Sequence, residues 1–265
     1  MRARIATALL GIPVLVAIIV FGRPWHLFPV LVLLVTVIAL GEYFRMAFPE
    51  ELGKRSLGLL LGILVSLMTL IPGLPVPELF LAPVVVVAFC SYLFMRGDLE
   101  PRYRDLGWTL LGVLYLGYLF PHIVLIYRAP QGVGWVFFVL LVAATGDIAS
   151  YFTGMAIGKR KLYPEVSPNK TVEGSIGGGV ASLVAGTAGA AFLLPGLPWL
   201  EAGFVALGVS ILGQTGDLFE SWIKRVFQVK DSGKLLPGHG GLLDRIDSLI
   251  FPAIFVAYYV RLLHS

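Results

Sequence analysis

Long apolar stretches, separated by short joints rich in Gly, Pro or charged residues, recur along the whole chain. A helix needs about 20 predominantly apolar residues to cross roughly 30 Å of hydrocarbon. The pattern predicts nine membrane-spanning helices, and it lacks the alternation of period two that is typical of an outer-membrane barrel. The predicted spans are residues 5–21, 27–44, 56–71, 79–95, 107–126, 133–157, 173–194, 200–220 and 248–263.

The composition indicates a membrane protein. Of the 265 residues, 14% are charged and 57% are hydrophobic, and the mean hydropathy is +0.87. A single soluble core stops growing at roughly 250–300 residues, so a soluble enzyme of this length could not bury so much apolar surface. A disordered chain and a disulfide scaffold are also excluded, and the one cysteine, Cys90, is interpreted as a packing residue. We predict an all-α polytopic helix bundle that forms one domain over 1–265, with spans in 1–130 and the polar motifs in 131–265.

Basic residues divide unevenly between the two faces of the predicted bundle. Seventeen of the 20 Lys and Arg residues fall on one face, and the other face receives Arg23, Arg128 and Arg261. The positive-inside rule makes the first face cytoplasmic, with the N-terminus inside and the C-terminus outside. The basic start followed by an apolar run resembles a signal peptide, but the run continues to Phe21 without an Ala-x-Ala site. We therefore expect an uncleaved first span in a bacterial-type inner membrane.

Small residues recur at every fourth position in three of the predicted spans. Such faces let helix backbones approach closely, which is how membrane helices pack. Packing within one chain is the first interpretation, and a homodimer interface is the alternative. The three faces consist of Gly146, Ser150, Gly154 and Gly158, of Gly174, Gly178, Ser182, Gly186 and Ala190, and of Gly58, Gly62 and Ser66.

Acidic residues lie inside or at the edge of two apolar spans. Asp147 is well inside the sixth span, where a carboxylate costs about 2.5–3.5 kcal/mol. Asp217, Ser221 and Lys224 are spaced i, i+4 and i+7 at the end of the eighth span, so one helix face would present all three. The structural alternatives are a packing carboxylate at Asp147 and a snorkelling, salt-bridged Lys224. The recurrence of the pattern favours a functional role.

The segment after the eighth span combines glycines with charge. Residues 237–241 read Pro-Gly-His-Gly-Gly, a loop in which backbone N–H groups can approach an anion. Asp244 and Asp247 then place two carboxylates on one face where the ninth span starts. Such hard oxygen ligands suit Mg²⁺, which typically takes one or two carboxylates plus substrate phosphates. Asp217 and Asp244 are candidates to share this ion, whereas zinc is not supported because no His or Cys has ligand spacing.

The loop between the sixth and seventh spans is predicted to lie on the same face. It carries Lys159, Arg160 and Lys170 together with Asn169 and several hydroxyl residues, followed by a glycine-rich helix start. Basic and hydroxyl groups before a helix N-terminus are typical of a phosphate site. Alternatively, a basic cluster beside a membrane can simply reflect the positive-inside rule or bind anionic lipid head groups. This loop and the 221–248 segment are predicted to lie on the same face, which favours the phosphate site.

Two blocks of this sequence resemble the phosphatidate cytidylyltransferase, or CDP-diacylglycerol synthase, family. One is Ser221-x-Ile-Lys-Arg-x4-Lys-Asp-x-Gly-x2-Leu-Pro-Gly-His-Gly-Gly-Leu-x-Asp-Arg-Ile-Asp. The other is Asp147-x3-Tyr with Gly158-Lys-Arg-Lys-Leu-Tyr-Pro-x2-Ser-Pro-Asn-Lys-Thr-x-Glu-Gly. The match covers roughly 146–250 without departure at the charged positions. The first 130 residues share only hydropathy and span count with the family, so no role is carried over to them.

The resemblance implies transfer of a cytidylyl group from CTP to phosphatidate, which yields CDP-diacylglycerol and pyrophosphate with Mg²⁺ and leaves room for a second metal ion. A lipid phosphate is already anionic near neutral pH, so the chemistry is mostly positioning and charge neutralisation. The expected metal ligands are Asp217, Asp244 and Asp147. The expected catalytic residues are Ser221, Lys224, Arg225, Lys230, Asp231, His239, Arg245 and Asp247, and the expected substrate-binding residues are Lys159, Arg160, Asn169 and Lys170.

Two other functions remain open from the sequence. A transporter would also need intramembrane carboxylates and a basic mouth, but it is expected to show broken helices at the midplane, whereas the polar groups here gather at one interface. A CTP-dependent transferase that acts on another lipid, such as an isoprenoid, would carry the same motifs. The expected partners are CTP, phosphatidate and membrane lipid, and no nucleic acid is expected.

Overall fold

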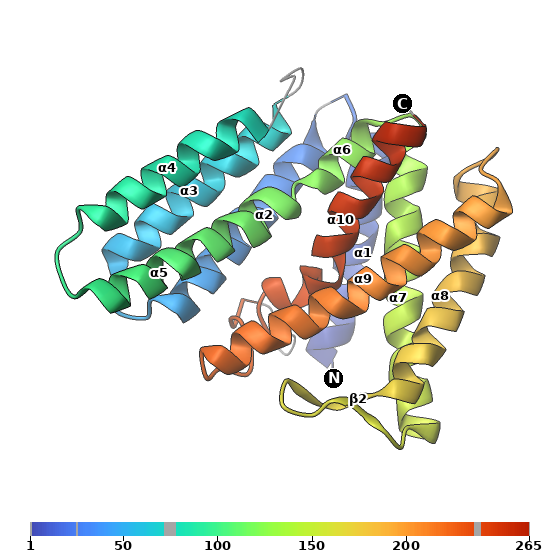
Figure 1. Ribbon diagram of the computed structural model, residues 1–265. Helices are drawn as coiled ribbons and strands as arrows, with labels where there is room; N and C mark the ends of the chain where they lie inside the picture. The colour runs from blue at the N-terminus through green and yellow to red at the C-terminus, as the bar shows by residue number, and fades with distance from the viewer. Residues whose placement is uncertain (1, 25, 72–77, 236–239, 265) are drawn as a thin grey trace. The chain divides into compact units, whose positions relative to one another are not determined.

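The computed structural model describes residues 2–24, 26–71, 78–235 and 240–264. Most of these residues are helical, which confirms the predicted all-α fold class. The helices are α1 (Arg2–Phe21), α2 (Leu27–Ala47), α3 (Leu52–Leu70), α4 (Glu78–Leu93), α5 (Leu99–Gly112), the π-helix η1 (Val113–Leu119), α6 (His122–Arg128), α7 (Gly132–Ile157), α8 (Val172–Leu193), α9 (Trp199–Val226) and α10 (Leu243–Leu263), and the strands are β1 (Lys161–Tyr163) and β2 (Ser167–Thr171) (Figure 1).

Every predicted span falls on helical residues, and the fifth, 107–126, covers the end of α5, the whole of η1 and most of α6. In the described part of the chain, seven helical stretches are long and apolar enough to cross a membrane, and Leu99–Arg128 is one of them. Two shorter apolar stretches, Gly11–Phe21 and Leu81–Leu93, lie where the first and fourth spans are predicted. The count of nine crossings and the cytoplasmic N-terminus stay predictions.

The chain divides into two compact units. The first consists of Met1–Leu125 and Asp231–Leu243, and the second consists of Ile126–Lys230 and Asp244–Ser265. The loop that precedes α10 therefore belongs with the N-terminal helices, although the helices that flank it in the sequence belong to the second unit.

Close helix packing holds the first unit together. A side chain at Gly58 on α3 would clash with the ring of Phe44 on α2, and one at Gly62 would lie 2.7 Å from Leu40. The wide turn of η1 also brings Gly117 against the Gly62 backbone, where a Cβ would lie 2.7 Å from the carbonyl oxygen. The small-residue face of α3 is thus used within the chain.

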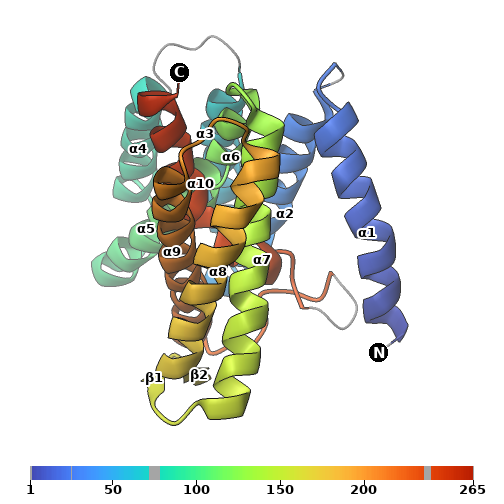
Figure 2. The same ribbon diagram turned by 90° about the vertical axis from the view of Figure 1, so that its right-hand side faces the viewer.

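In the second unit, α7 and α8 run side by side and are joined at one end by the β1–β2 hairpin (Figure 2). A Cβ at Gly178 would clash with the Ser150 hydroxyl, and one at Gly174 would lie 2.7 Å from the Ser150 carbonyl oxygen. The small faces of these two helices therefore pack against each other, as the first interpretation of the sequence expects. A homodimer through these faces stays a prediction that the contacts do not support.

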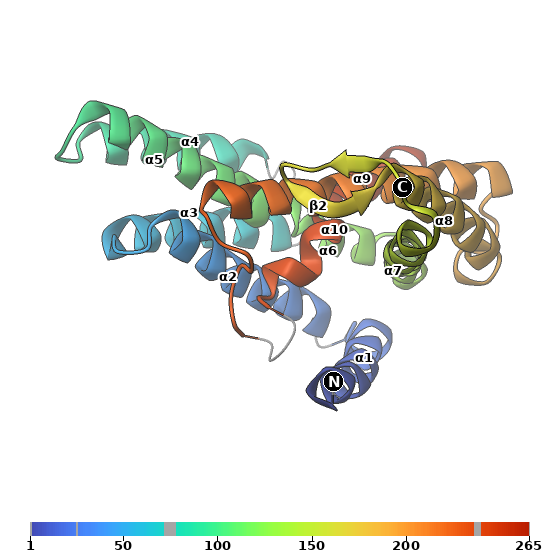
Figure 3. The ribbon, with the colours of Figure 1, turned by 90° about the horizontal axis from the view of Figure 1, so that it is seen from below.

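The β1–β2 hairpin was not expected from the sequence. It extends from the ends of α7 and α8 along α9 (Figure 3), and the Arg225 guanidinium of α9 donates from Nε to the Val166 carbonyl oxygen in its turn at 3.2 Å. Thr171 ends β2 and caps α8, because its hydroxyl accepts the Gly174 N–H at 3.1 Å. The hairpin thus positions the basic loop against the helix that carries the 217–224 face.

Candidate active site

Charged residues gather at one end of the second unit, where α7 and α9 end and α8 and α10 begin. Glycines on α9 let α10 approach closely there. A Cβ at Gly213 would lie 3.0 Å from the Ser248 carbonyl oxygen, and one at Gly216 would clash with the Asp247 carbonyl oxygen. This packing fixes the start of α10 beside the last turns of α9, so the two acidic segments of the sequence lie next to each other.

The first ion pair joins the hairpin to α9. Lys170 on β2 places its Nζ 2.6 Å from Asp217 Oδ2, and about a third of each side chain is exposed (28% and 32%). The Ser221 hydroxyl lies one helical turn further along, 3.5 Å from Asp217 Oδ1. Asp217 and Ser221 of the predicted 217–224 face are therefore neighbours, and Lys170 from the predicted basic loop contacts Asp217. Because this pair is accessible, a ligand can reach both charges.

A second, more deeply buried cluster surrounds Lys224. Its Nζ lies 2.7 Å from Asp244 Oδ1 on α10, and it also forms an ion pair with Glu220 one turn earlier on α9. The exposed fractions of the Lys224, Asp244 and Glu220 side chains are 13%, 9% and 0%. An unpaired charge at such a place would be costly, so the two carboxylates hold the ammonium in position.

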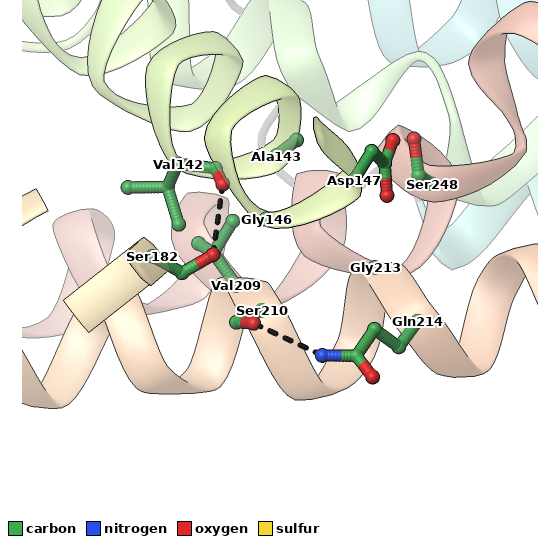
Figure 4. Close-up of a pocket in the computed structure, with 10 residues that line it drawn as sticks. All are labelled: Val142, Ala143, Gly146, Asp147, Ser182, Val209, Ser210, Gly213, Gln214 and Ser248. Carbon is green, nitrogen blue, oxygen red and sulfur yellow. Dashed lines mark hydrogen bonds between the residues drawn. The ribbon is translucent and has the colours of Figure 1, made fainter. Parts of the chain in front are cut away.

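Asp147 and Asp247 lie on the same side of the site as Asp217. The Asp147 carboxylate lies beside the Ser248 hydroxyl, and both residues line a small cavity between α7, α8, α9 and α10 (Figure 4). The cavity has a volume of about 10 Å³, which suits one water molecule. Asp147, Asp217 and Asp247 are close enough for their charges to interact. The intramembrane carboxylate on α7 thus belongs to the same cluster as those on α9 and α10.

The other predicted site residues lie outside these two ion pairs. The backbone N–H groups of Lys159 and Arg160 donate to the Glu173 carboxylate, at 3.0 Å from Lys159 to Oε2. Their side chains are exposed, as are those of Asn169, Lys230 and Arg245. Asp231 is exposed and belongs to the first unit, and His239 lies outside the described residues.

Comparisons with known proteins decide the family. The model of the cytidylyltransferase family matches residues 2–263. The chain belongs to the cytidylyltransferase family. It is 35% identical to a phosphatidate cytidylyltransferase of Bacillus subtilis, over 99% of this chain and 98% of the relative. It is 34% identical to one of Staphylococcus saprophyticus over 95% of each chain, and 44% identical to one of Brucella suis over 63% of this chain and 61% of the relative. The family predicted from the two sequence blocks is confirmed.

The acidic cluster of this cytidylyltransferase has the chemistry of a site for a hard divalent cation. Asp217, Asp147 and Asp247 offer oxygen donors only, as Mg²⁺ prefers. Within the described residues, no group of three or more His, Cys, Asp or Glu side chains is close enough to enclose a metal ion. Asp217 and Asp244, the two ligands predicted first, each contact a lysine. The donor set therefore fits a metal ion that also uses oxygen atoms of a substrate.

The sequence interpretation missed Glu220 of the cytidylyltransferase. Its signal was present, because an acidic residue four positions before a lysine on a helix forms an i, i+4 pair. In the structure Glu220 is fully buried beside Lys224. Lys224 is thus held from two sides, by its own helix and by Asp244, rather than by Asp217 and Ser221 of the predicted stripe.

Proposed function

We propose that this chain transfers a cytidylyl group from CTP to phosphatidate, forming CDP-diacylglycerol and pyrophosphate. A phosphate oxygen of phosphatidate attacks the α-phosphorus of CTP, the bond to the β-phosphate breaks, and pyrophosphate leaves with the electron pair. The observation that carries this proposal is a paired set of lysines and aspartates at one end of membrane-spanning helices in a chain of the cytidylyltransferase family.

The paired charges suit a reaction between two polyanions. Two phosphorylated substrates repel each other, so the enzyme must neutralise and align them more than it must remove a proton. Lys170 is accessible and forms its ion pair with Asp217, so it can turn from the carboxylate to a phosphate group. Lys224 is fixed between Glu220 and Asp244, which suits a cation that holds its place through the reaction.

We assign the remaining roles by position. Ser221 and Arg225 lie beside the two pairs on α9 and would orient phosphate oxygens. The exposed Lys159, Arg160 and Asn169 would bind the nucleotide or the lipid head group from the hairpin side. The sequence resemblance alone assigns catalytic roles to Lys230, Asp231, His239 and Arg245. We propose that the site faces the cytoplasm, where CTP is found.

We also propose that the reaction depends on Mg²⁺. Asp217 would hold the ion together with oxygen atoms of the substrates, and Asp147, Asp247 and Asp244 would support it from nearby. A bound divalent cation would supply charge stabilisation at the α-phosphate and the leaving pyrophosphate. The support is the oxygen-only donor set and the interaction of three carboxylate charges at the end of the spans.

The test is a direct assay of the purified protein. Labelled CTP, Mg²⁺ and phosphatidate in mixed micelles should yield a labelled CDP-lipid and an equal amount of pyrophosphate. A parallel reaction with a polyprenyl phosphate distinguishes a different lipid acceptor, and omission of Mg²⁺ tests the metal. The proposal is contradicted if no CDP-lipid forms with either acceptor, whether or not CTP is consumed.

A further inference from the structure

An open groove runs between α8 and α9. It has a volume of about 480 Å³, within the range of about 300–1,000 Å³ that is typical of small-molecule sites. The two helices pack closely near the turn that joins them, where a Cβ at Gly186 would clash with Ala206, and they diverge toward the β1–β2 hairpin (Figure 1). The groove lies on the diverging side, and Leu162 of β1 lines it at the hairpin end. All of its lining residues belong to the second unit.

The lining of the groove changes along its length. At the hairpin end, polar side chains are mixed with aliphatic ones, and the polar residues are Ser175, Gln214 and Thr215. Further from the hairpin the lining is apolar and consists of Gly179, Val180, Leu183, Leu207 and Ile211. Gly179 keeps this part wide, because a Cβ there would meet no atom within 4 Å. A ligand with one polar end and a long apolar part matches this order.

The polar end of the groove adjoins the candidate active site. Gln214 lines both the groove and the small cavity that Asp147 also lines. Its Nε2 donates to the Ser175 carbonyl oxygen and to the Ser210 hydroxyl, each at 3.3 Å. These hydrogen bonds hold the Gln214 side chain between the two spaces, so the groove and the acidic cluster are one side chain apart.

The length of the groove matches one leaflet of a bilayer. Leu207 and Leu218 line it on α9, and they lie about 16 Å apart along the helix at a rise of about 1.5 Å per residue. Half of a hydrocarbon core of roughly 30 Å is about 15 Å. Ser221 follows Leu218 by one helical turn, and its hydroxyl lies 3.5 Å from Asp217 Oδ1. A lipid with its phosphate beside Asp217 can therefore keep a chain in the groove within one leaflet.

We propose that the α8–α9 groove holds one acyl chain of the phosphatidate substrate and so places the lipid phosphate at the Lys170–Asp217 pair. The inference rests on the proposed function, in which phosphatidate is the acceptor. Bilayer lipid is as apolar as the aliphatic walls of the groove, so the chain gains little free energy by leaving the bilayer. The groove acts by orientation, because a phosphate held in line with CTP reacts faster than one that moves freely.

Gly179→Phe is the decisive variant, because its ring would fill the groove one helical turn beyond Ser175. A palmitoyl chain then has to leave the groove, which shifts the phosphate that it positions. We expect kcat/KM for dipalmitoyl phosphatidate to fall about tenfold or more, whereas kcat/KM for dibutanoyl phosphatidate, whose short chains end before this level, should fall less than about threefold.

Ala188→Phe is the matched control, because Ala188 is an exposed residue of α8 outside the groove. It should leave kcat/KM for both lipids at the wild-type value. A general loss of folded protein would lower the rates with both lipids alike. Equal losses with the two lipids in Gly179→Phe, or equal effects of the two variants, overturn the inference.

Photolabelling of the wild-type protein gives a second measurement that does not depend on turnover. Phosphatidate with a diazirine at the end of one acyl chain should label the helices near Leu183 and Leu207, and a diazirine next to the ester should label them near Ser175. Unlabelled phosphatidate should compete, whereas phosphatidylglycerol, which is also anionic, should not. If the wild-type chain transfers no cytidylyl group, the proposed function fails and the labelling still decides whether the groove binds this lipid.

Two other occupants of the groove give different results. Equal competition by phosphatidylglycerol would mean that any membrane lipid fills the groove. A disulfide between two copies of Ile211→Cys, in the Cys90→Ser background, would mean that a second copy of the chain covers it. Either result overturns the inference.

Discussion

Single charged residues in this protein are stabilised by partners that lie far away in the sequence. Lys170 of the hairpin pairs with Asp217 of α9, and Lys224 pairs with Asp244 of α10. A charge inside a membrane helix is expensive unless it is paired. Each pair therefore offsets the cost of burying its charges. In the proposed function the same pairs supply a cation for phosphate and a carboxylate for the metal ion.

Asp217→Asn tests the accessible pair. The change keeps the shape of the side chain but removes its charge, so we expect kcat to fall by about 100-fold or more, as for other lost charge stabilisers. Activation by Mg²⁺ should also require a higher concentration of the ion. The measurement is a titration of initial rate against Mg²⁺ for membrane-inserted, purified protein.

The control for this variant is Asp98→Asn, because the Asp98 side chain is exposed and makes no capping hydrogen bond. It should retain wild-type activity. Near-normal turnover of Asp217→Asn at low Mg²⁺ would contradict the role of Asp217 as a metal ligand.

Lys224→Met separates stability from catalysis. Removal of the ammonium leaves the fully buried Glu220 without its ion-pair partner, and breaking a buried pair costs about 3 kcal/mol or more. We expect a clear drop in the melting temperature and a loss of activity. Adding Glu220→Gln should recover much of the melting temperature, because no buried charge is then left unpaired at that position, whereas activity should stay lost. Recovery of activity in the double variant would show that Lys224 has only a structural role.

The charged residues of the site show which of its features could be predicted from the sequence. The 217–224 face follows from helical periodicity, and the metal and phosphate chemistry follows from residue type. The partner of each lysine does not follow, because it depends on how the hairpin and α10 approach α9. The contacts of Glu42 do not follow from the sequence either, because its carboxylate accepts the Leu242 and Leu243 N–H groups of a loop near the other end of the chain.

At the scale of helices and strands, the apolar pattern locates every helix but misses two local features. The hairpin strands are short and contain Pro168, and their pairing depends on α8 and α9. In the π-helix η1, Gly117 lies close to the Gly62 backbone of α3. Hydropathy carries no information on either contact. It does predict the small-residue faces, which pack α7 against α8.

Two adjacent glycines of α8 test this packing with a matched control. A Cβ at Gly178 would clash with Ser150 of α7, whereas one at Gly179 would meet no atom within 4 Å. Overpacking of this kind typically costs about 1–3 kcal/mol, so Gly178→Ala should lower the melting temperature of the purified protein. Gly179→Ala should leave the melting temperature unchanged or raise it slightly, because alanine favours a helix over glycine. Equal effects of the two substitutions would contradict direct α7–α8 contact at Gly178.

At the scale of the whole molecule, the uneven distribution of basic residues predicts which side of the membrane the site faces. The hairpin with Lys159, Arg160 and Lys170 lies on the face that is rich in basic residues, and the joint around Pro130, at the other end of α7, lies on the opposite face. The positive-inside rule then predicts that the site faces the cytoplasm. This orientation is required by the proposed function, because CTP is a cytoplasmic substrate.

Thiol labelling tests the orientation. Cys90→Ser removes the one native thiol, and single cysteines are then placed at the exposed positions Pro130 and Glu165. A membrane-impermeant maleimide should label Pro130→Cys in intact cells and Glu165→Cys only in inverted vesicles, since α7 separates the two positions. Cys90→Ser alone should stay unlabelled, and detergent should expose both cysteines. The reverse labelling pattern would place the lysine and aspartate pairs on the side of the membrane without CTP, so the orientation and the proposed reaction would fail together.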